Sequence, residues 1–357
     1  MTQAELSGTM PVSGRQRFDE AALGRWLHEH LPGFAGLTRI EQFRGGQSNP
    51  TFLISAADDA RYVLRKKPAG TLLPSAHAVD REFRVISALH GSDVPVARPL
   101  CLCTDPSVIG TIFYVMGYAS GRNFWDPAFP QMSPPERAAL YREMNRVMAA
   151  LHTLDYAAVG LADYGKPGNY FARQIARWSG QYRASETERI EAMEKLLVWL
   201  PANIPVGDET VLVHGDYRLD NLIFDSGSPR VLAIVDWELS TLGHPLADFS
   251  YHVMLWRIPA GESGGLLGLD LPALGIPGEA EYIAAYGART GRAAIDPQVW
   301  EFCMAYNLFR IASIRQGIMK RVLEGTAASA HAREAGSKAR ATAELAWRQV
   351  EEHLGAG

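Results

Sequence analysis

Two acidic segments lie close together in the middle of the chain, and each follows an apolar run that predicts a short strand. The first spans residues 214–221 and the second residues 236–238, with the turn-forming stretch 225–229 between them. A hairpin that closes in this stretch places Asn221 roughly opposite Asp236. Carboxylate and amide oxygens would then converge on one point, which favours a hard cation such as Mg²⁺.

Asp216 precedes Asn221 by five positions in the same loop, so it can reach the site without binding the metal. This division matches phosphoryl transfer, in which one carboxylate receives the proton of an acceptor hydroxyl while an Asn and an Asp hold the metal. The spacing is that of the kinase catalytic loop, H-x-D-x-x-x-x-N, followed by a separate metal-binding Asp. Each residue alone is also a common turn former, so the prediction depends on the whole set.

The composition bounds the class of protein. A chain of 357 residues fits two lobes, and 47% hydrophobic with 21% charged residues is ordinary for a globular protein. A net charge of −4 offers no basic surplus for nucleic acid. Cys101, Cys103 and Cys303 cannot build a disulfide framework, and no apolar run reaches the length of a membrane span. We therefore expect a cytoplasmic protein with no nucleic-acid or membrane partner.

The N-terminal part of the chain predicts a helix at 18–31 and strands at 37–44, 51–55 and 61–66. A loop between the first two strands is rich in residues that allow close backbone approach, and its N–H groups could bind phosphate oxygens. The members of this loop are Gly45, Gly46, Gln47, Ser48 and Asn49. An ordinary hairpin turn is the alternative interpretation.

A predicted helix at 75–89 carries Glu82 on its apolar face. A carboxylate there is costly unless a cation meets it. The preceding strand offers candidates, and because side chains alternate, Val63 and Arg65 share one face of it while Leu64 and Lys66 share the other. A strand cation paired with a helix Glu orients the triphosphate in kinase-like folds. The alternative is that the strand Arg or Lys only solvates the end of its strand, and that Glu82 lies at the edge of the apolar helix face.

A further strand at 111–118 would link two lobes, with the backbone near Met116 and Tyr118 facing an adenine, unless it is an ordinary central strand. The remainder of the chain predicts helices at 134–151, 170–182, 186–200, 245–256, 279–290, 297–323 and 332–354. We expect an α+β fold with two lobes. The nucleotide-binding lobe, 1–117, would contain a small antiparallel sheet and a helix. The larger helical lobe, 118–357, would carry the catalytic hairpin and bind the substrate.

These residues resemble the aminoglycoside phosphotransferase and choline kinase family, a branch of the bilobal protein-kinase-like fold, and the resemblance covers most of the chain. More narrowly, they look like the phosphotransferase domain fused to certain acyl-CoA dehydrogenases. The segments that carry the family resemblance are 213–216 through Asn221, 236–238 and 243–248, and those that carry the narrower one are 45–52, 63–68, 77–82 and 168–171.

The resemblance implies specific roles. Asp216 would be the catalytic base, and Asn221 and Asp236 would hold Mg²⁺. Arg65 would replace the usual strand lysine that pairs with Glu82, although its planar fork differs from an ammonium group. Arg218 matches a position where kinases carry a lysine that meets the transferred phosphate. Asp248 and His214 would brace the catalytic loop.

The leading hypothesis is an ATP-dependent kinase that phosphorylates a hydroxyl of a small molecule. The fused relatives imply that the acceptor is a hydroxyacyl-CoA. Basic and aromatic residues of the C-terminal helices also favour such an anionic acceptor. These residues are Tyr251, Trp256, Arg257, Tyr306, Phe309, Arg310, Arg315, Lys320 and Arg321. An aminoglycoside-modifying phosphotransferase and a non-catalytic nucleotide-binding regulator are the alternatives. The sequence leaves open the acceptor, the choice between ATP and GTP, the oligomeric state, and whether a dehydrogenase acts on the product.

Overall fold

The computed structural model describes residues 8–44, 49–68, 78–261, 264–292, 294–327, 331–353 and 355. Its packing divides the chain into two compact units. Unit 1 comprises residues 1–130, 157–161 and 218–240, and unit 2 comprises residues 131–156, 162–217 and 241–357. In this division the residues after position 117 as far as 130, and residues 218–240, belong to the same unit as the N-terminal sheet.

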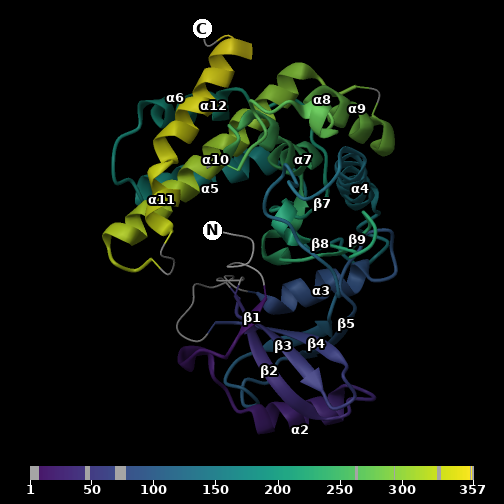
Figure 1. Ribbon diagram of the computed structural model, residues 1–357. Coiled ribbons are helices and arrows are strands. Elements are labelled where there is room, and N and C mark those ends of the chain that lie inside the picture. The colour runs from purple at the N-terminus through teal and green to yellow at the C-terminus, as the bar shows by residue number, and fades with distance from the viewer. Residues whose placement is uncertain are drawn as a thin grey trace. The chain divides into compact units, whose positions relative to one another are not determined.

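Unit 1 is built on a six-stranded antiparallel sheet (Figure 1). In spatial order its strands are β1 (Thr9–Met10), β2 (Leu37–Phe43), β3 (Thr51–Ala56), β4 (Arg61–Lys66), β6 (Phe113–Gly117) and β5 (Pro99–Cys103). Short connections between β2, β3 and β4 make their pairing antiparallel, as the sequence predicts. Helix α2 (Glu20–His30) begins where the Asp19 carboxylate accepts a hydrogen bond from the Ala22 N–H at 2.8 Å.

The two faces of this sheet differ in chemistry. One face packs on α2 in an apolar core that includes Leu27, Phe52 and Leu64. Helix α3 (Val79–Leu89) covers the other face at β5 and β6, and there the Arg65 side chain meets Glu82. The predicted alternation along β4 is therefore confirmed: Leu64 lies in the core on α2, whereas Arg65 faces α3.

The predicted hairpin is present in unit 1, with a register that differs by one residue from the predicted one. Strands β8 (Leu222–Phe224) and β9 (Val231–Ile234) pair with Leu222 opposite Ile234. The Val235 N–H then donates to the Asn221 carbonyl at 2.9 Å, so Asn221 lies opposite the residue before Asp236. Next to the turn, Phe224 lies opposite Val231, which is two residues from the predicted register. The register shift between Ile223 and Phe224 adds a residue to β9 and so reduces the difference to one.

The connector after β6 pairs with the same hairpin. Arg122 and Phe224 exchange two backbone hydrogen bonds of 2.8 Å each. Gly121 is required at the preceding position, since a Cβ there would lie 2.2 Å from the Phe224 carbonyl oxygen. A parallel bridge between Val96 and Ile234 ties the other strand of the hairpin to unit 1. These contacts explain why the hairpin belongs to unit 1.

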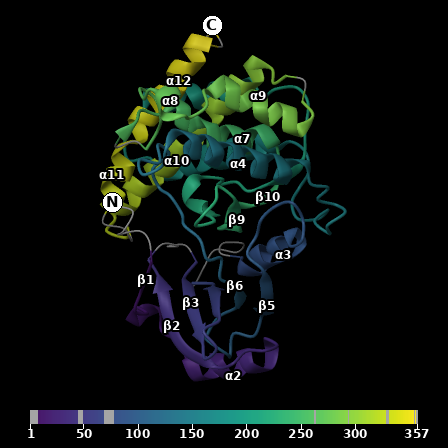
Figure 2. The same cartoon turned by 45° about the vertical axis from the view of Figure 1, so that its right-hand side comes forward.

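Unit 2 is mainly helical (Figure 2). Its longer helices are α4 (Pro134–Thr153), α5 (Tyr170–Ala184), α6 (Glu191–Ala202), α7 (Pro245–Val253), α9 (Glu279–Thr290), α10 (Pro297–Leu323) and α12 (Ala339–His353). Helix α10 packs against α5, α7 and α12, and strand β7 (Val211–Val213) pairs with β10 (Thr241–Gly243). Short elements complete the unit: α8 (Leu271–Leu274), α11 (Ala332–Ser337) and the 3-10 turn η4 (Met254–Arg257).

The predicted α+β fold class, a small antiparallel sheet followed by a larger helical part, is confirmed. The last predicted helix, 332–354, is instead divided into α11 and α12. The interruption is at Lys338, two residues after Gly336, where a Cβ would lie 2.9 Å from the Met319 backbone of α10. Within the described ranges, no helix combines the length and apolarity needed to cross a bilayer.

Candidate functional site

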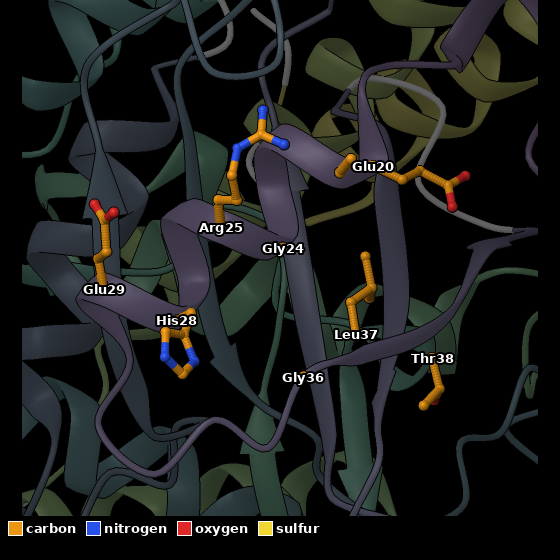
Figure 3. A pocket seen from close by; sticks show the side chains of 9 residues that line it. Glu20, Gly24, Arg25, His28, Glu29, Gly36, Leu37 and Thr38 are labelled. Atoms are coloured by element: carbon orange, nitrogen blue, oxygen red, sulfur yellow. The ribbon is translucent and has the colours of Figure 1, made fainter.

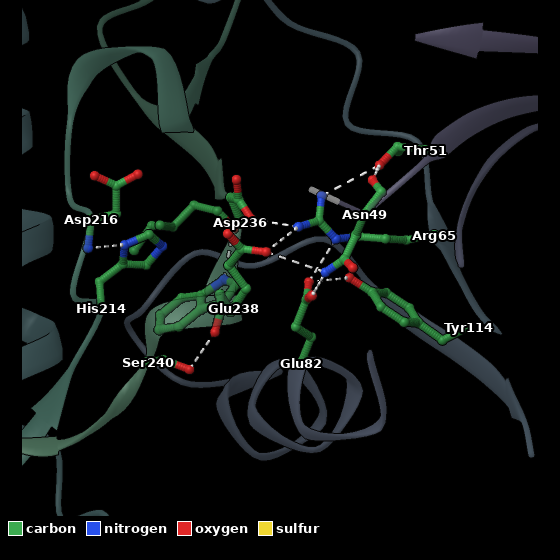
Figure 4. A network of polar contacts seen from close by, with 12 residues as sticks. Asn49, Thr51, Arg65, Glu82, Tyr114, His214, Asp216, Asp236, Glu238 and Ser240 are labelled. Carbon is green, nitrogen blue, oxygen red and sulfur yellow. Dashed lines mark hydrogen bonds and ion pairs between the residues drawn. The ribbon is translucent and has the colours of Figure 1, made fainter. Parts of the chain in front are cut away.

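Arg65 is the centre of a buried polar network in unit 1 (Figure 4). Its Nε lies 2.7 Å from Oε2 of Glu82 on α3, and its terminal nitrogen donates a short hydrogen bond to Oδ1 of Asp236. A second carboxylate from the same turn, Glu238, lies 4.0 Å from that terminal nitrogen. The predicted pairing of Arg65 with Glu82 is therefore confirmed, and it extends to the predicted metal-binding residue Asp236.

Two neutral side chains support Glu82. The Asn49 amide donates to Glu82 Oε1 at 2.7 Å and to Glu238 at 3.3 Å, and the Tyr114 hydroxyl donates to Glu82 Oε2 at 3.2 Å. Asn49 is fully buried, so its amide braces carboxylates, whereas the sequence predicted a place for it in the phosphate loop. The other predicted loop residues, Gly45, Gly46, Gln47 and Ser48, lie outside the described residues.

The network carries an excess of negative charge. Glu82, Asp236 and Glu238 all approach the single guanidinium of Arg65. Burial raises the pKa of Glu82 to about 7, against the lowering effect of Arg65. Burial disfavours the charge on Arg65, but Glu82 and Asp236 outweigh it and hold the Arg65 pKa above its usual range. The cluster would gain from an additional cation.

The residues predicted to hold that cation lie at the open end of the hairpin. Asn221 ends the 3-10 turn η2 (Leu219–Asn221) directly before β8, and Asp236 precedes η3 (Trp237–Leu239) with left-handed backbone angles, φ 67° and ψ 60°. Such a conformation is strained for a non-glycine residue and is typical of functional positions. Among the described residues no cluster of three His, Cys, Asp or Glu side chains forms a metal site. Mg²⁺ usually needs only one or two protein ligands besides substrate phosphates and water, and the oxygen donors here fit that pattern.

Asp216 lies in unit 2, in the turn after β7. Gly215 adopts φ 82°, which turns the chain sharply at this point. The Asp216 N–H donates to Nδ1 of His214 at 3.2 Å, and its Oδ1 accepts a hydrogen bond of 2.5 Å from the Tyr251 hydroxyl. The predicted base is thus held by its own loop and by helix α7.

Asp248, on α7, braces the loop around Asp216. Its Oδ2 accepts from the His214 N–H at 2.7 Å, and its Oδ1 accepts from the Gly215 N–H at 2.9 Å. His152 lies 3.3 Å from Oδ2 of the same carboxylate. Burial raises the pKa of Asp248, but the hydrogen bonds from His152 and the His214 backbone outweigh it, so the pKa lies below its usual range. The carboxylate therefore stays ionised and holds both N–H groups.

The remaining predicted residues are less closely tied to these networks. The Arg218 side chain is half exposed, and its Nε donates to Asp220 at 2.6 Å. Met116 is buried in β6, where it pairs with Val63. The Tyr118 N–H donates to the Arg61 carbonyl at 3.3 Å, and the Arg61 guanidinium covers the Tyr118 ring. Their predicted contacts with a nucleotide stay predictions.

A separate hollow lies on unit 1 between α2 and the start of β2 (Figure 3). Its lining mixes charged side chains with small residues and includes Glu20, Arg25, His28, Gly36 and Leu37. None of the predicted site residues lines it.

The sequence prediction missed several residues that contact Glu82 or hold Asp216 and its loop. Tyr114 shares the Arg65 face of the sheet, which strand alternation around the core residues Phe113 and Val115 could have shown. Tyr251 is three residues after Asp248 on α7 and so lies on the same helix face. No local pattern indicates the contact of His152 with Asp248, which are 96 positions apart.

Comparison with known proteins gives consistent matches. The phosphotransferase enzyme family matches residues 39–305. Mouse acyl-CoA dehydrogenase family member 10 is 46% identical over 96% of this chain and 32% of its own length. Mouse acyl-CoA dehydrogenase family member 11 is 44% identical over 90% of this chain and 42% of its own length. The chain thus spans less than half the length of these relatives.

Solved structures agree with these matches. A crystal structure from Ralstonia eutropha, provisionally named an aminoglycoside phosphotransferase, superposes with a TM-score of 0.86 at 55% identity, covering 94% of this chain and 99% of that one. Choline kinase from Cryptosporidium parvum superposes with a TM-score of 0.66 at 12% identity, covering 95% of this chain and 98% of that one, which is a likeness of fold.

Proposed function

Because this chain belongs to the phosphotransferase enzyme family, we propose that it is an ATP-dependent, Mg²⁺-requiring kinase that transfers the γ-phosphate to a hydroxyl of a small molecule. The observation that carries this proposal is the buried contact of Arg65 with both Glu82 and Asp236. In kinase-like enzymes such a strand cation, fixed by a helix carboxylate, orients the triphosphate.

The other residues take roles that their contacts support. Asp236 and Asn221 would hold Mg²⁺, which, when bound, offsets charge on the phosphates. Asp216, fixed by Tyr251 and by the loop itself, would receive or orient the proton of the acceptor hydroxyl. The exposed guanidinium of Arg218 would contact the transferred phosphate.

For the acceptor we propose a hydroxyacyl-CoA. The relatives named acyl-CoA dehydrogenases support it, since they contain a long region beyond the part that this chain matches. Basic residues of α10 give limited support. Arg315 is largely buried and bonds to Thr342, and no carboxylate among the described residues forms an ion pair with it. Arg257 is bound by Glu279 and Glu301, so it is not available for an anionic acceptor.

The test is phosphate transfer from ATP with Mg²⁺ to a panel of hydroxyacyl-CoAs, aminoglycosides and amino alcohols. We expect transfer to a hydroxyacyl-CoA, and we expect Asp216→Asn to lower kcat by about 100-fold or more while ATP affinity stays within about twofold. The matched control is Asp225→Asn, a partly exposed residue of the hairpin turn whose carboxylate accepts the Gly227 N–H, a role that an amide can fill.

Each outcome identifies a different function. Transfer to an aminoglycoside alone would show an antibiotic-modifying enzyme and refute the acceptor. Binding of ATP without transfer to any acceptor would indicate a nucleotide-binding regulator. Full turnover in the Asp216→Asn variant would exclude Asp216 as the base.

A further inference from the structure

We propose that Tyr251 and Arg310 are positioning residues that set the orientation of the Asp216 carboxylate from within unit 2. The inference rests on the proposed function, because it assigns Asp216 as the base. The observations that carry it are a hydrogen bond from Tyr251 to Asp216, a hydrogen bond from Arg310 to the adjacent residue, and the stacking of these two side chains on each other.

Tyr251 acts on the carboxylate itself. Its hydroxyl donates to Asp216 Oδ1 at 2.5 Å, a length typical of a bond to an ionised acceptor. The ring is 6% exposed and belongs to α7, the helix that also supplies Asp248 to the same loop. One carboxylate oxygen of Asp216 is therefore fixed to a rigid element, which stops rotation of the carboxylate. A base needs such fixed geometry because its efficiency depends on orientation toward the proton.

Arg310 anchors both partners of this hydrogen bond. It lies on α10 with 6% exposure, and its terminal nitrogen donates to the Gly215 carbonyl at 2.6 Å, directly before Asp216. Its guanidinium carbon lies 4.9 Å from the centre of the Tyr251 ring and 5.5 Å from that of Trp178. The cation therefore fixes the backbone of the loop and the ring of the donor at once.

The charge of Arg310 indicates a role beyond packing. Among the described residues, no carboxylate lies within 4.0 Å of it, although a buried cation is costly without compensation. Ring faces and the Gly215 carbonyl offset part of this cost, and the charge of Asp216 supplies attraction at longer range. A cation over the Tyr251 ring also withdraws electron density from the phenol, which strengthens its hydroxyl as a donor to Asp216.

A double-mutant cycle tests the contact without any acceptor. Urea midpoints of the wild type, Tyr251→Phe, Asp216→Ala and the double variant are compared. We expect that the two single shifts do not add, because each variant removes the same hydrogen bond. Additive shifts would overturn the proposal whatever the protein phosphorylates. Non-additive shifts with no phosphate transfer to any member of the panel would refute the proposed function alone and leave the positioning contact supported.

The kinetic arm uses the acceptor of the panel that is phosphorylated fastest. We expect Tyr251→Phe to lower kcat by about 10- to 100-fold with the KM for ATP unchanged, because orientation of the base is lost and nucleotide binding is not. Arg310→Met should lower kcat at least as much, and Arg310→Lys, which keeps the charge, should recover part of it. The control Tyr282→Phe loses a comparable buried bond to His252, of 2.9 Å, and should keep kcat within about twofold. A kcat for Tyr251→Phe equal to that of this control would overturn the proposal.

Discussion

Replacement of Asp248 by Asn is the sharpest test of how the loop that carries Asp216 is held. The carboxylate accepts one backbone N–H on each oxygen, from His214 on Oδ2 and from Gly215 on Oδ1. An amide has one accepting oxygen, so whichever way it turns, its NH₂ group faces one of the two N–H donors. One charge-assisted hydrogen bond is lost, and a buried donor is left unpaired.

The magnitude follows from these two losses. A hydrogen bond to a charged group contributes about 1.5–3 kcal/mol, and an unsatisfied buried donor costs about 1–3 kcal/mol more. We therefore expect Asp248→Asn to lower the free energy of unfolding by about 2.5–6 kcal/mol at neutral pH, a large part of the total for a typical domain. The Asp248 pKa is lowered, so this stabilisation is present above the unfolded pKa, which is close to 3.8, and is lost as pH falls below it.

The assay is urea unfolding followed by far-UV circular dichroism, since most helices belong to unit 2. Asp296→Asn is the matched control. Asp296 also accepts two N–H groups, from Gln298 at 2.7 Å and Val299 at 3.4 Å, but both bonds end on Oδ1 and an amide can keep them. The control should change stability by less than about 0.5 kcal/mol, because Asn and Asp are comparable helix caps. A loss below about 1 kcal/mol in Asp248→Asn would refute the brace.

Two further variants probe unit 1. Since the pKa of Glu82 is raised from 4.5 to about 7, the stability that its proton contributes is present below pH 4.5 and lost as pH rises through 7. As pH rises from about 5 to about 8, the Glu82→Gln variant should therefore gain stability relative to the wild type, by up to about 3 kcal/mol, as measured by urea unfolding. The opposite trend would contradict the raised pKa. Gly121→Ala should lower stability by about 1–3 kcal/mol, because its Cβ would lie 2.2 Å from the Phe224 carbonyl oxygen. The control Gly180→Ala lies in α5, where nothing is within 4 Å of the new Cβ, and it should raise stability by about 0.5–1 kcal/mol. Equal effects of the two substitutions would refute the close approach of Gly121 to Phe224.

The parts of the fold that depend on local pattern were predictable from the sequence. The short connections between β2, β3 and β4 indicated an antiparallel sheet, and side-chain alternation along β4 placed Arg65 on the face opposite Leu64. The spacing within 214–221 and the turn at 225–229 indicated the hairpin. Its register could not be predicted to the residue, because it depends on where the turn closes and on one extra residue in β9, and no side-chain pattern marks either.

The side chains that hold Asp216 and Asp236 depend on contacts between distant parts of the chain, which explains why motif reasoning proposed these two residues and not the side chains that support them. Asp236 is held by Arg65, 171 positions away, and Gly215 by Arg310, 95 positions away. A motif records residues that a single loop can present, whereas a buried hydrogen bond forms wherever packing leaves an N–H or carboxylate without water. In this protein the geometry of the loop that carries Asp216 depends on Asp248, Tyr251 and Arg310, supplied by α7 and α10. We therefore expect substitutions on these helices to change turnover as strongly as many substitutions in the motif itself.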